Sequence, residues 1–138
     1  MKPLPTPFQP FNPRGVLGLL IGSLLAVACG SPKQFNFPAA DWQRDRLGCT
    51  GRREALAGEL EAIRRDLRGL TEPEILGLLG KPDAQALQGR GQKYFVYYLE
   101  TGPQCDNARA VSQARTVAIR LNALGFVTEL TYQRGQPR

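Results

Sequence analysis

The spacing of apolar residues predicts a helix over residues 52–67. Within this segment Leu56, Leu60, Ile63 and Leu67 follow one another at intervals of four, three and four residues. This spacing places the four side chains along one side of an α-helix, while the charged residues between them face water. The segment therefore has the pattern of a helix that packs one face against a core.

A shorter helix is predicted on each side of this segment, over residues 41–47 and after residue 71. The second has a clear start signal in the sequence TEPE at residues 71–74. The Thr71 hydroxyl can accept a hydrogen bond from the Glu74 backbone N–H, and the Glu74 carboxylate can reach back to Thr71, which is a capping box. Gly80 ends this helix.

Three strand-like segments follow in the second half of the chain. Residues 93–100 are rich in aromatic and β-branched residues, and apolar residues alternate with polar ones in residues 115–122 and 126–132. Residues 101–114 are too long for a tight hairpin and are expected to form a mobile loop. The pattern predicts an α+β fold, in which two or three helices pack on a three-stranded antiparallel sheet.

The start of the chain has the pattern of a secretory signal. Residues 1–14 carry Lys2 and Arg14 without an acidic residue, and residues 16–28 are apolar or small throughout. A helix of this length spans about 20 Å, which is short of the roughly 30 Å core of a bilayer. We therefore expect residues 1–28 to be a cleaved signal peptide.

The sequence AVAC at residues 26–29 fits a lipobox, the signal at which a lipoprotein precursor is cut before a lipid-bearing cysteine. Cys29 is therefore the expected lipid-attachment site. Palmitate-type acyl chains on its thiol would anchor the mature chain to a membrane. An uncleaved anchor helix, or an ordinary signal followed by a chance cysteine, is the alternative.

Gly30 follows this cysteine, and residues 30–40 contain no acid. By the sorting rule of enteric bacteria, in which Asp at this position retains a lipoprotein in the inner membrane, Gly30 favours the outer membrane, with the domain facing the periplasm. The expected organisation is a flexible tether over residues 29–40, a small α+β domain over residues 41–134 and a tail over residues 135–138.

Cys49 and Cys105 remain once Cys29 is assigned to lipid. An even pair of cysteines in an exported, oxidising compartment predicts a disulfide. In the chain-entropy model, closing the loop over residues 49–105 stabilises the fold by roughly 4 kcal/mol. Two free thiols, a redox couple and a partial metal site are the alternatives, although a redox pair is normally a Cys-x-x-Cys motif.

No histidine occurs among the 138 residues, which excludes imidazole bases, His-dependent triads and His-ligated metal sites. The sequence also contains no glycine-rich phosphate loop, metal-binding cluster or nucleophile elbow. The acidic residues of the predicted helices are interpreted as solvated or capping groups. We therefore expect a protein that is not an enzyme and needs no metal or cofactor.

The net charge of +6 includes a basic run at residues 64–68, with Arg52 and Arg53 nearby. These residues are interpreted either as an ordinary solvated helix side or as a surface for phospholipid headgroups. Export makes nucleic acid an implausible partner.

The aromatic segment YFVYY at residues 94–98 supplies candidate partner-binding residues. Alternate residues of a strand face opposite sides of the sheet, so some of these rings must face away from the helices. Exposed tyrosines are common in partner-binding surfaces, and Tyr94 and Tyr97 are therefore the candidates. The alternative is that the rings cover the sheet beneath the helices.

Three motifs lie within residues 70–132: the sequence LGKP at residues 79–82, the aromatic strand at 94–98 and the closing hairpin at 117–130. In these motifs the segment resembles the BamE/SmpA-like outer-membrane lipoprotein domain. The resemblance implies a helix-and-hairpin α+β fold that binds other components of outer-membrane protein assembly and, in some members, anionic lipid. The long predicted helix at 52–67 and the Cys49–Cys105 pair depart from the family pattern, which indicates a diverged relative.

Together these patterns predict a lipid-anchored periplasmic interaction or scaffold module of the cell envelope. Its expected partners are the membrane, through the N-terminal lipid, and an envelope protein. A lipoprotein that binds a small ligand or lipid between its helices and sheet is the alternative.

Overall fold

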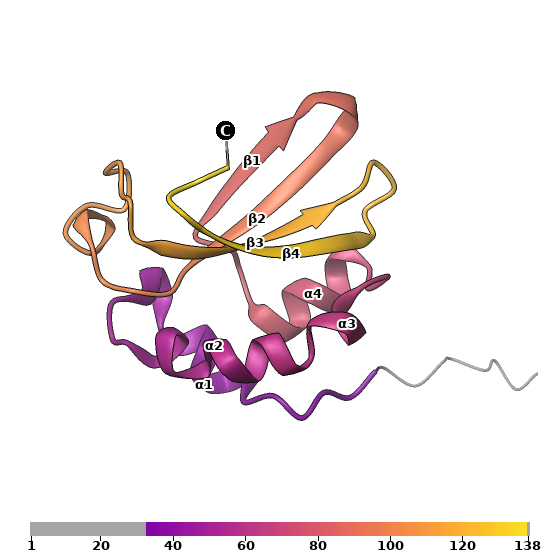
Figure 1. Ribbon diagram of the computed structural model, residues 1–138, viewed down its shortest axis with the longest axis horizontal. Helices are drawn as coiled ribbons and strands as arrows, with labels where there is room; N and C mark the ends of the chain where they lie inside the picture. Colours follow the sequence, from indigo (N-terminus) through magenta and orange to yellow (C-terminus); the bar gives the residue numbers. More distant parts are fainter. Residues whose placement is uncertain (1–32, 138) are drawn as a thin grey trace, which may run out of the picture. The chain divides into compact units, whose positions relative to one another are not determined.

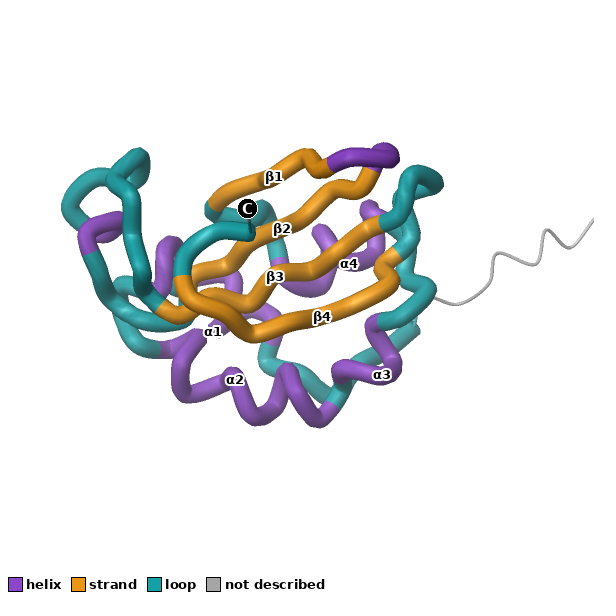
Figure 2. Tube along the Cα trace, turned by 45° about the horizontal axis from the view of Figure 1, so that its top comes forward, coloured by secondary structure: helices purple, strands orange, loops and turns teal. Residues whose placement is uncertain are grey.

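A computed structural model of the chain describes residues 33–137, and the predicted signal peptide and Cys29 lie outside this range. Within it, helices lie on one side of an antiparallel sheet, which confirms the α+β class (Figures 1 and 2). The helices are α1 (Ala39–Arg44), α2 (Arg52–Ala62), α3 (Arg64–Leu67) and α4 (Glu72–Leu79). The strands are β1 (Ala84–Gln88), β2 (Gln92–Tyr98), β3 (Arg115–Leu121) and β4 (Val127–Arg134), and single 3₁₀ turns form η1 (Arg46–Gly48), η2 (Gly89–Gly91) and η3 (Pro103–Cys105).

The helix predicted over residues 52–67 is interrupted at Ile63, which separates α2 from α3. The backbone of Ile63 departs from the helical region, with φ −94° and ψ 3°. The apolar stripe survives this break, because Leu60 and Leu67 on either side of it are fully buried. The periodicity therefore predicted the buried face correctly and missed the break.

The capping box at the start of α4 forms as predicted. The Glu74 backbone N–H donates to Thr71 Oγ1 over 3.4 Å, and the Thr71 backbone N–H donates to Glu74 Oε2 over 2.7 Å. The chain leaves α4 through Gly80, whose φ of 75° lies in the left-handed region that favours glycine. A Cβ at position 80 would also lie 2.9 Å from the Gln43 side chain, so α1 and α4 approach closely here.

The sheet contains one strand more than the sequence predicted. Its order is β1-β2-β3-β4, and neighbouring strands are antiparallel. The missed strand, β1, has the sequence AQALQ, which lacks the β-branched and aromatic residues typical of strands. Its pairing with β2, from Ala84 opposite Val96 to Gln88 opposite Gln92, creates the strand. The prediction of a three-stranded sheet was wrong for this reason.

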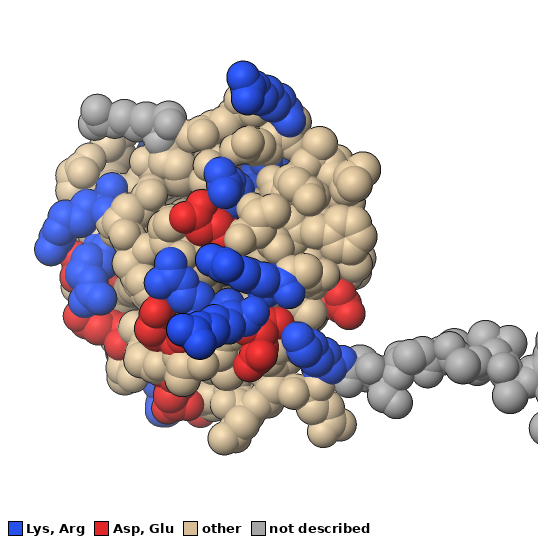
Figure 3. All heavy atoms as spheres, turned by 45° about the vertical axis from the view of Figure 1, so that its right-hand side comes forward, with Lys and Arg blue, Asp and Glu red and all other residues tan. Residues whose placement is uncertain are grey.

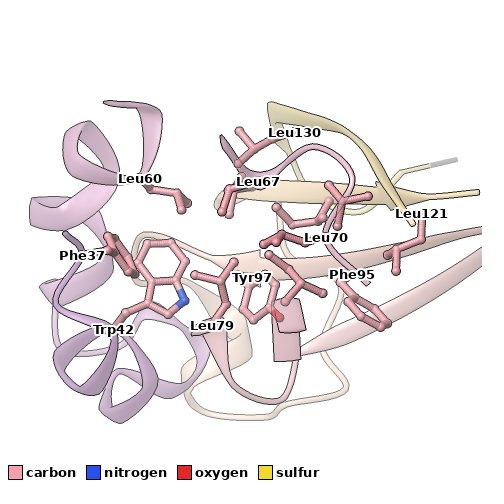
Figure 4. Packing of buried hydrophobic residues seen from close by; sticks show 14 of the residues in the cluster. Phe37, Trp42, Leu60, Leu67, Leu70, Leu79, Phe95, Tyr97, Leu121 and Leu130 are labelled. Atoms are coloured by element: carbon pink, nitrogen blue, oxygen red, sulfur yellow. The ribbon is translucent and has the colours of Figure 1, made fainter. Parts of the chain in front are cut away.

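Apolar side chains on one face of the sheet form the core together with the helices (Figure 4). Trp42 of α1 contributes the largest fully buried side chain. Its ring centroid lies 5.7 Å from that of Phe37 and 6.1 Å from that of Tyr97. The sheet and its margins supply the buried residues Phe95, Tyr97, Leu99, Val117, Ile119, Leu121, Val127 and Leu130.

Both ends of the described chain are held against this domain. Phe37 is only 9% exposed and Phe35 packs against the core, although both fall within the expected tether of residues 29–40. At the other end, the Gly135 backbone N–H donates to the Ala114 carbonyl, and the Gly135 carbonyl accepts from Thr116 Oγ1 over 2.7 Å. The described part of the tether from Phe35 onward therefore belongs to the folded unit.

A buried ion pair between Arg53 and Asp83 joins α2 to the start of β1. Both side chains are completely buried. Arg53 Nε also donates to the Trp42 carbonyl over 3.1 Å, and Arg53 Nη1 donates to the Tyr98 carbonyl over 3.3 Å. The interpretation of Arg53 as part of a solvated or lipid-facing basic surface was wrong, because its side chain lies inside the domain beside Asp83. Its partners accept from Nε and Nη1, whereas the buried Nη2 has no hydrogen-bond partner within residues 33–137.

Two carboxylates bind the backbone around this ion pair. Asp83 and the fully buried Asp45 each accept two backbone N–H groups. Burial alone would raise the pKa of Asp45, but the hydrogen bonds from the start of α2 outweigh it and hold this pKa below its ordinary value. The donors are the backbone N–H groups of Leu47 and Tyr98 for Asp83, and of Thr50 and Arg53 for Asp45.

The predicted disulfide partners meet beside the same region. The Sγ atoms of Cys49 and Cys105 are 2.00 Å apart and link the end of η1 to η3. Next to Cys105, the side chain of Gln104 is buried and donates to the carbonyls of Leu47 (3.1 Å) and Glu100 (2.8 Å). The loop expected to be mobile is therefore fixed to the helical half at this point.

Replacing Asp83 with Ala should lower the free energy of unfolding by about 3–5 kcal/mol, because Arg53 would remain buried without its counter-charge. The matched control is Asp41→Ala, which breaks the exposed pair with Arg44 and should cost at most about 1 kcal/mol. Urea denaturation monitored by circular dichroism measures the free energy of unfolding of both variants. Equal losses in the two variants would contradict the importance assigned to the buried pair.

Candidate functional site

The face of the sheet that points away from the helices is the candidate partner-binding surface, here called the outer face (Figures 1 and 2). The strand register defines its rows, because residues opposite each other in neighbouring strands share a face. One such row crosses the sheet near the β1–β2 turn and consists of Ala86, Tyr94, Arg120 and Glu129.

The structure separates the two candidate tyrosines. Tyr94 is half-buried and lies on the outer face. Tyr97 is fully buried on the helix side, where its hydroxyl donates to the Gly80 carbonyl over 2.9 Å. Burial raises the pKa of Tyr97 above its ordinary value. The choice of Tyr97 as a partner-binding residue was wrong, because positions 94 and 97 have opposite parity along the strand and face opposite sides.

A cavity of about 320 Å³ opens between the tips of the two hairpins. Arg90 and Gln92 line it from the β1–β2 hairpin, and Arg120, Asn122 and Thr128 line it from the β3–β4 hairpin. The cavity therefore adjoins the row that contains Tyr94.

The two hairpin tips that form this cavity are in contact. A Cβ added at Gly91 would lie 3.2 Å from the Ala123 Cβ, and Ala123 also lines the cavity. Arg120 of the Tyr94 row forms an ion pair with Glu129 over 3.0 Å.

A second cavity, of about 270 Å³, lies at the opposite end of the outer face. Tyr98 forms part of its wall, and the loop over residues 109–113 and the tail residues Gln136 and Pro137 form the rest. Gln136 Nε2 donates to the Tyr98 hydroxyl over 3.4 Å. The tail therefore covers this end of the outer face.

The basic run predicted at residues 64–68 borders an open hollow on the helix side, lined by Arg64, Arg65 and Arg68 with Glu61. The Arg64 guanidinium donates hydrogen bonds to Glu61 Oε1 over 3.1 Å and to the Leu130 carbonyl over 2.6 Å. Basic and acidic side chains intermingle on the face drawn in Figure 3. Arg64 therefore makes structural contacts, whereas Arg65 and Arg68 are exposed cationic groups.

The chain enters the described domain beside this hollow. Lys33, the first described residue, donates from Nζ to the Asp66 carbonyl of α3 over 2.9 Å. The helix layer is therefore the side of the domain that is nearest in sequence and space to residue 33.

Two acidic side chains of α4 make structural contacts. Glu72 pairs with Lys93 over 2.8 Å, and Glu74 serves the capping box. Within residues 33–137, no three His, Cys, Asp or Glu side chains meet in an arrangement that could hold a metal ion. No helix in the same range has the length and apolar character needed to cross a bilayer.

Comparisons of this chain with protein-family models, with curated proteins and with solved structures found no match.

Sequence reasoning proposed Tyr94, which lies on the outer face, and did not propose the arginines beside it. Arg120 lies in a segment whose alternation predicted an outward-facing side chain, and this alternation was the available signal. Arg90 belongs to the β1–β2 turn, and no signal could have placed it there while β1 itself was unrecognised.

Tyr132 connects the sheet to α2, and its ionisation makes the free energy of unfolding depend on pH in the alkaline range. Its hydroxyl donates to the Ala57 carbonyl over 3.0 Å, and burial raises the pKa of Tyr132 to about 12. An unfolded tyrosine ionises near about pH 10. Between these values the unfolded state loses a proton that the folded state keeps, so the free energy of unfolding falls as pH rises above about 10.

We therefore expect Tyr132→Phe to flatten the loss of stability between about pH 10 and 12. Urea titrations at several pH values across this interval measure the slope for the parent and the variant. Some slope should remain, since Tyr97 is also buried, and Tyr97→Phe should reduce it further. An unchanged slope in both variants would contradict this account.

Proposed function

We propose that this chain is a lipid-anchored module of the cell envelope that binds another envelope protein through the outer face of its sheet. Cys29 carries the lipid after removal of residues 1–28, and the domain faces the periplasm from the outer membrane. By its sequence resemblance, the domain is a diverged relative of the BamE/SmpA-like lipoproteins and acts in or near outer-membrane protein assembly. It serves as a scaffold and not as an enzyme.

The observation that carries this proposal is the partial exposure of the Tyr94 row on the outer face. The other end of that face is covered, since Val96, Tyr98, Thr116 and Ala118 are buried. Helices cover one face, while the outer face has no helix over it in the described residues (Figure 1). Lys33 contacts α3 in the helix layer, and the Tyr94 row lies on the opposite face of the sheet, where a partner can reach it.

The basic hollow offers a second surface for the membrane. Arg65 and Arg68 are exposed on the side where Lys33 joins the domain. Each cationic side chain near an anionic leaflet contributes about 1 kcal/mol of attraction. This contribution would supplement the lipid anchor and favour one orientation of the domain.

A lipoprotein that binds a small ligand or lipid is the second candidate. The two cavities of about 270 and 320 Å³ favour it, because they approach the lower limit of typical small-molecule sites. Both cavities are open at the outer face and do not lie between the helices and the sheet, where the sequence analysis expected a cleft. Recovery of a lipid or small molecule with the purified protein, without a protein partner, would favour this candidate.

The anchor can be tested with Cys29→Ser. Without the thiol there is no lipid attachment, so most of the protein should move from the outer-membrane fraction to a soluble or inner-membrane precursor fraction. Cell fractionation with immunodetection measures the shift, and mass spectrometry of the parent should show an acylated N-terminal Cys29. An unmodified Cys29 with residues 1–28 still attached would contradict the proposal.

The partner-binding face can be tested by photo-crosslinking in living cells. A photoreactive residue in place of Tyr94 should give a discrete adduct with an envelope protein, because this position is accessible on the outer face. The same residue in place of Glu59, which is exposed on α2, is the control and should give no such adduct. Adducts from position 59 alone would place the partner on the helix layer and overturn the assignment.

A further inference from the structure

We propose that the cavity between the two hairpin tips is a binding site for a carboxylate, held by Arg90 and Arg120. This inference rests on the proposed function and deepens it, because it names the chemical group through which a partner would engage the outer face. The expected source is the C-terminus or an acidic side chain of a protein segment. The cavity of about 320 Å³ has room for one such residue.

Arg120 lies in the floor of the site with unused hydrogen-bonding capacity. Its side chain is 35% exposed and makes an ion pair with Glu129 through Nη2. Its Nε is buried and has no hydrogen-bond partner within residues 33–137. A buried donor without an acceptor is unfavourable, and a carboxylate that enters the cavity can accept from a guanidinium through two oxygens.

Arg90 brings a second guanidinium to the cavity from a distant part of the chain. It is exposed at the β1–β2 turn and makes no hydrogen bond or ion pair with another residue of the described range. Its φ of 64° lies in the left-handed region, which is uncommon for residues other than glycine. With the φ of 70° at Gly91, this conformation belongs to the tight turn that joins β1 to β2 and presents the Arg90 side chain at the hairpin tip.

The charge balance of the site favours a carboxylate over a phosphate. Arg90 and Arg120 contribute two positive charges, and Glu129 contributes one negative charge. The remaining single positive charge matches a carboxylate, whereas a phosphate monoester at neutral pH carries close to two negative charges. Leu121 and Ala123 also line the cavity, and these apolar residues suit a carboxylate attached to an apolar body.

The test uses the full-length lipidated protein in neutral detergent and follows the Arg Nε–H signals by NMR. N-acetyl-leucine is the probe, and N-acetyl-leucinamide is the matched molecule without the charge. We expect saturable shifts of the Arg120 Nε–H signal with the acid and none with the amide. Arg90→Gln, followed at the Arg120 Nε–H signal, and Arg120→Gln, followed at the Arg90 Nε–H signal, should each weaken binding by about tenfold or more. Each removes a charge-assisted hydrogen bond.

Arg65→Gln is the control, because it removes the same charge from the helix layer and should leave the affinity unchanged. Arg90→Gln changes an exposed turn residue, so its result does not depend on the stability of the sheet. The proposal is overturned by an absence of saturable shifts, by equal binding of the amide, by tighter binding of inorganic phosphate, or by an equal effect of Arg65→Gln.

This test is separate from the crosslinking at position 94. Binding of N-acetyl-leucine without a crosslinked protein would support the carboxylate site and count against the protein partner. A crosslinked partner without N-acetyl-leucine binding would support the proposed function and overturn the carboxylate site.

Discussion

The buried contact between Arg53 and Asp83 holds the helix layer and the sheet together. Arg53 belongs to α2 and Asp83 immediately precedes β1, so this pair fixes two segments that are 30 residues apart. The guanidinium also lies 5.3 and 5.4 Å from the ring centroids of Trp42 and Tyr97. One charged side chain thus connects the largest aromatic residue of the core to the edge of the sheet, and its charge is tolerable only because these partners surround it.

The sequence predicted those features that depend on residues close together in the chain. The capping box at 71–74 and the apolar stripe from Leu56 to Leu67 are local, and both occur in the structure. β1 is a strand because β2 offers it a hydrogen-bonding edge, and its own residues carry little strand preference. The burial of Arg53 likewise depends on Asp83, which no local pattern connects to it. Tertiary contacts decided both cases.

The candidate site depends on the same distinction. Alternation along β2 implied two faces but did not identify which face the helices would cover, and Tyr94 and Tyr97 were therefore chosen together although they cannot share a surface. The structure shows which face each tyrosine lies on, because the Tyr97 hydroxyl donates to the Gly80 carbonyl at the end of α4. The cavity lined by Arg90 and Arg120 could not be predicted from the sequence. It forms where two hairpins meet, and one of them includes β1, which the sequence analysis did not recognise.

The buried polar contacts and the proposed arginine site lie at opposite ends of the sheet. The disulfide, the buried ion pair and Asp45 surround the end at Tyr98, where Gly48 lies so close that a Cβ would approach the Tyr98 carbonyl to 2.8 Å. At the other end the hairpin tips carry Arg90 and the 82% exposed Leu124. Because the fold is secured at one end, side chains at the tips are not required for the core. Their exposure and unused charge leave them available for the contact proposed above.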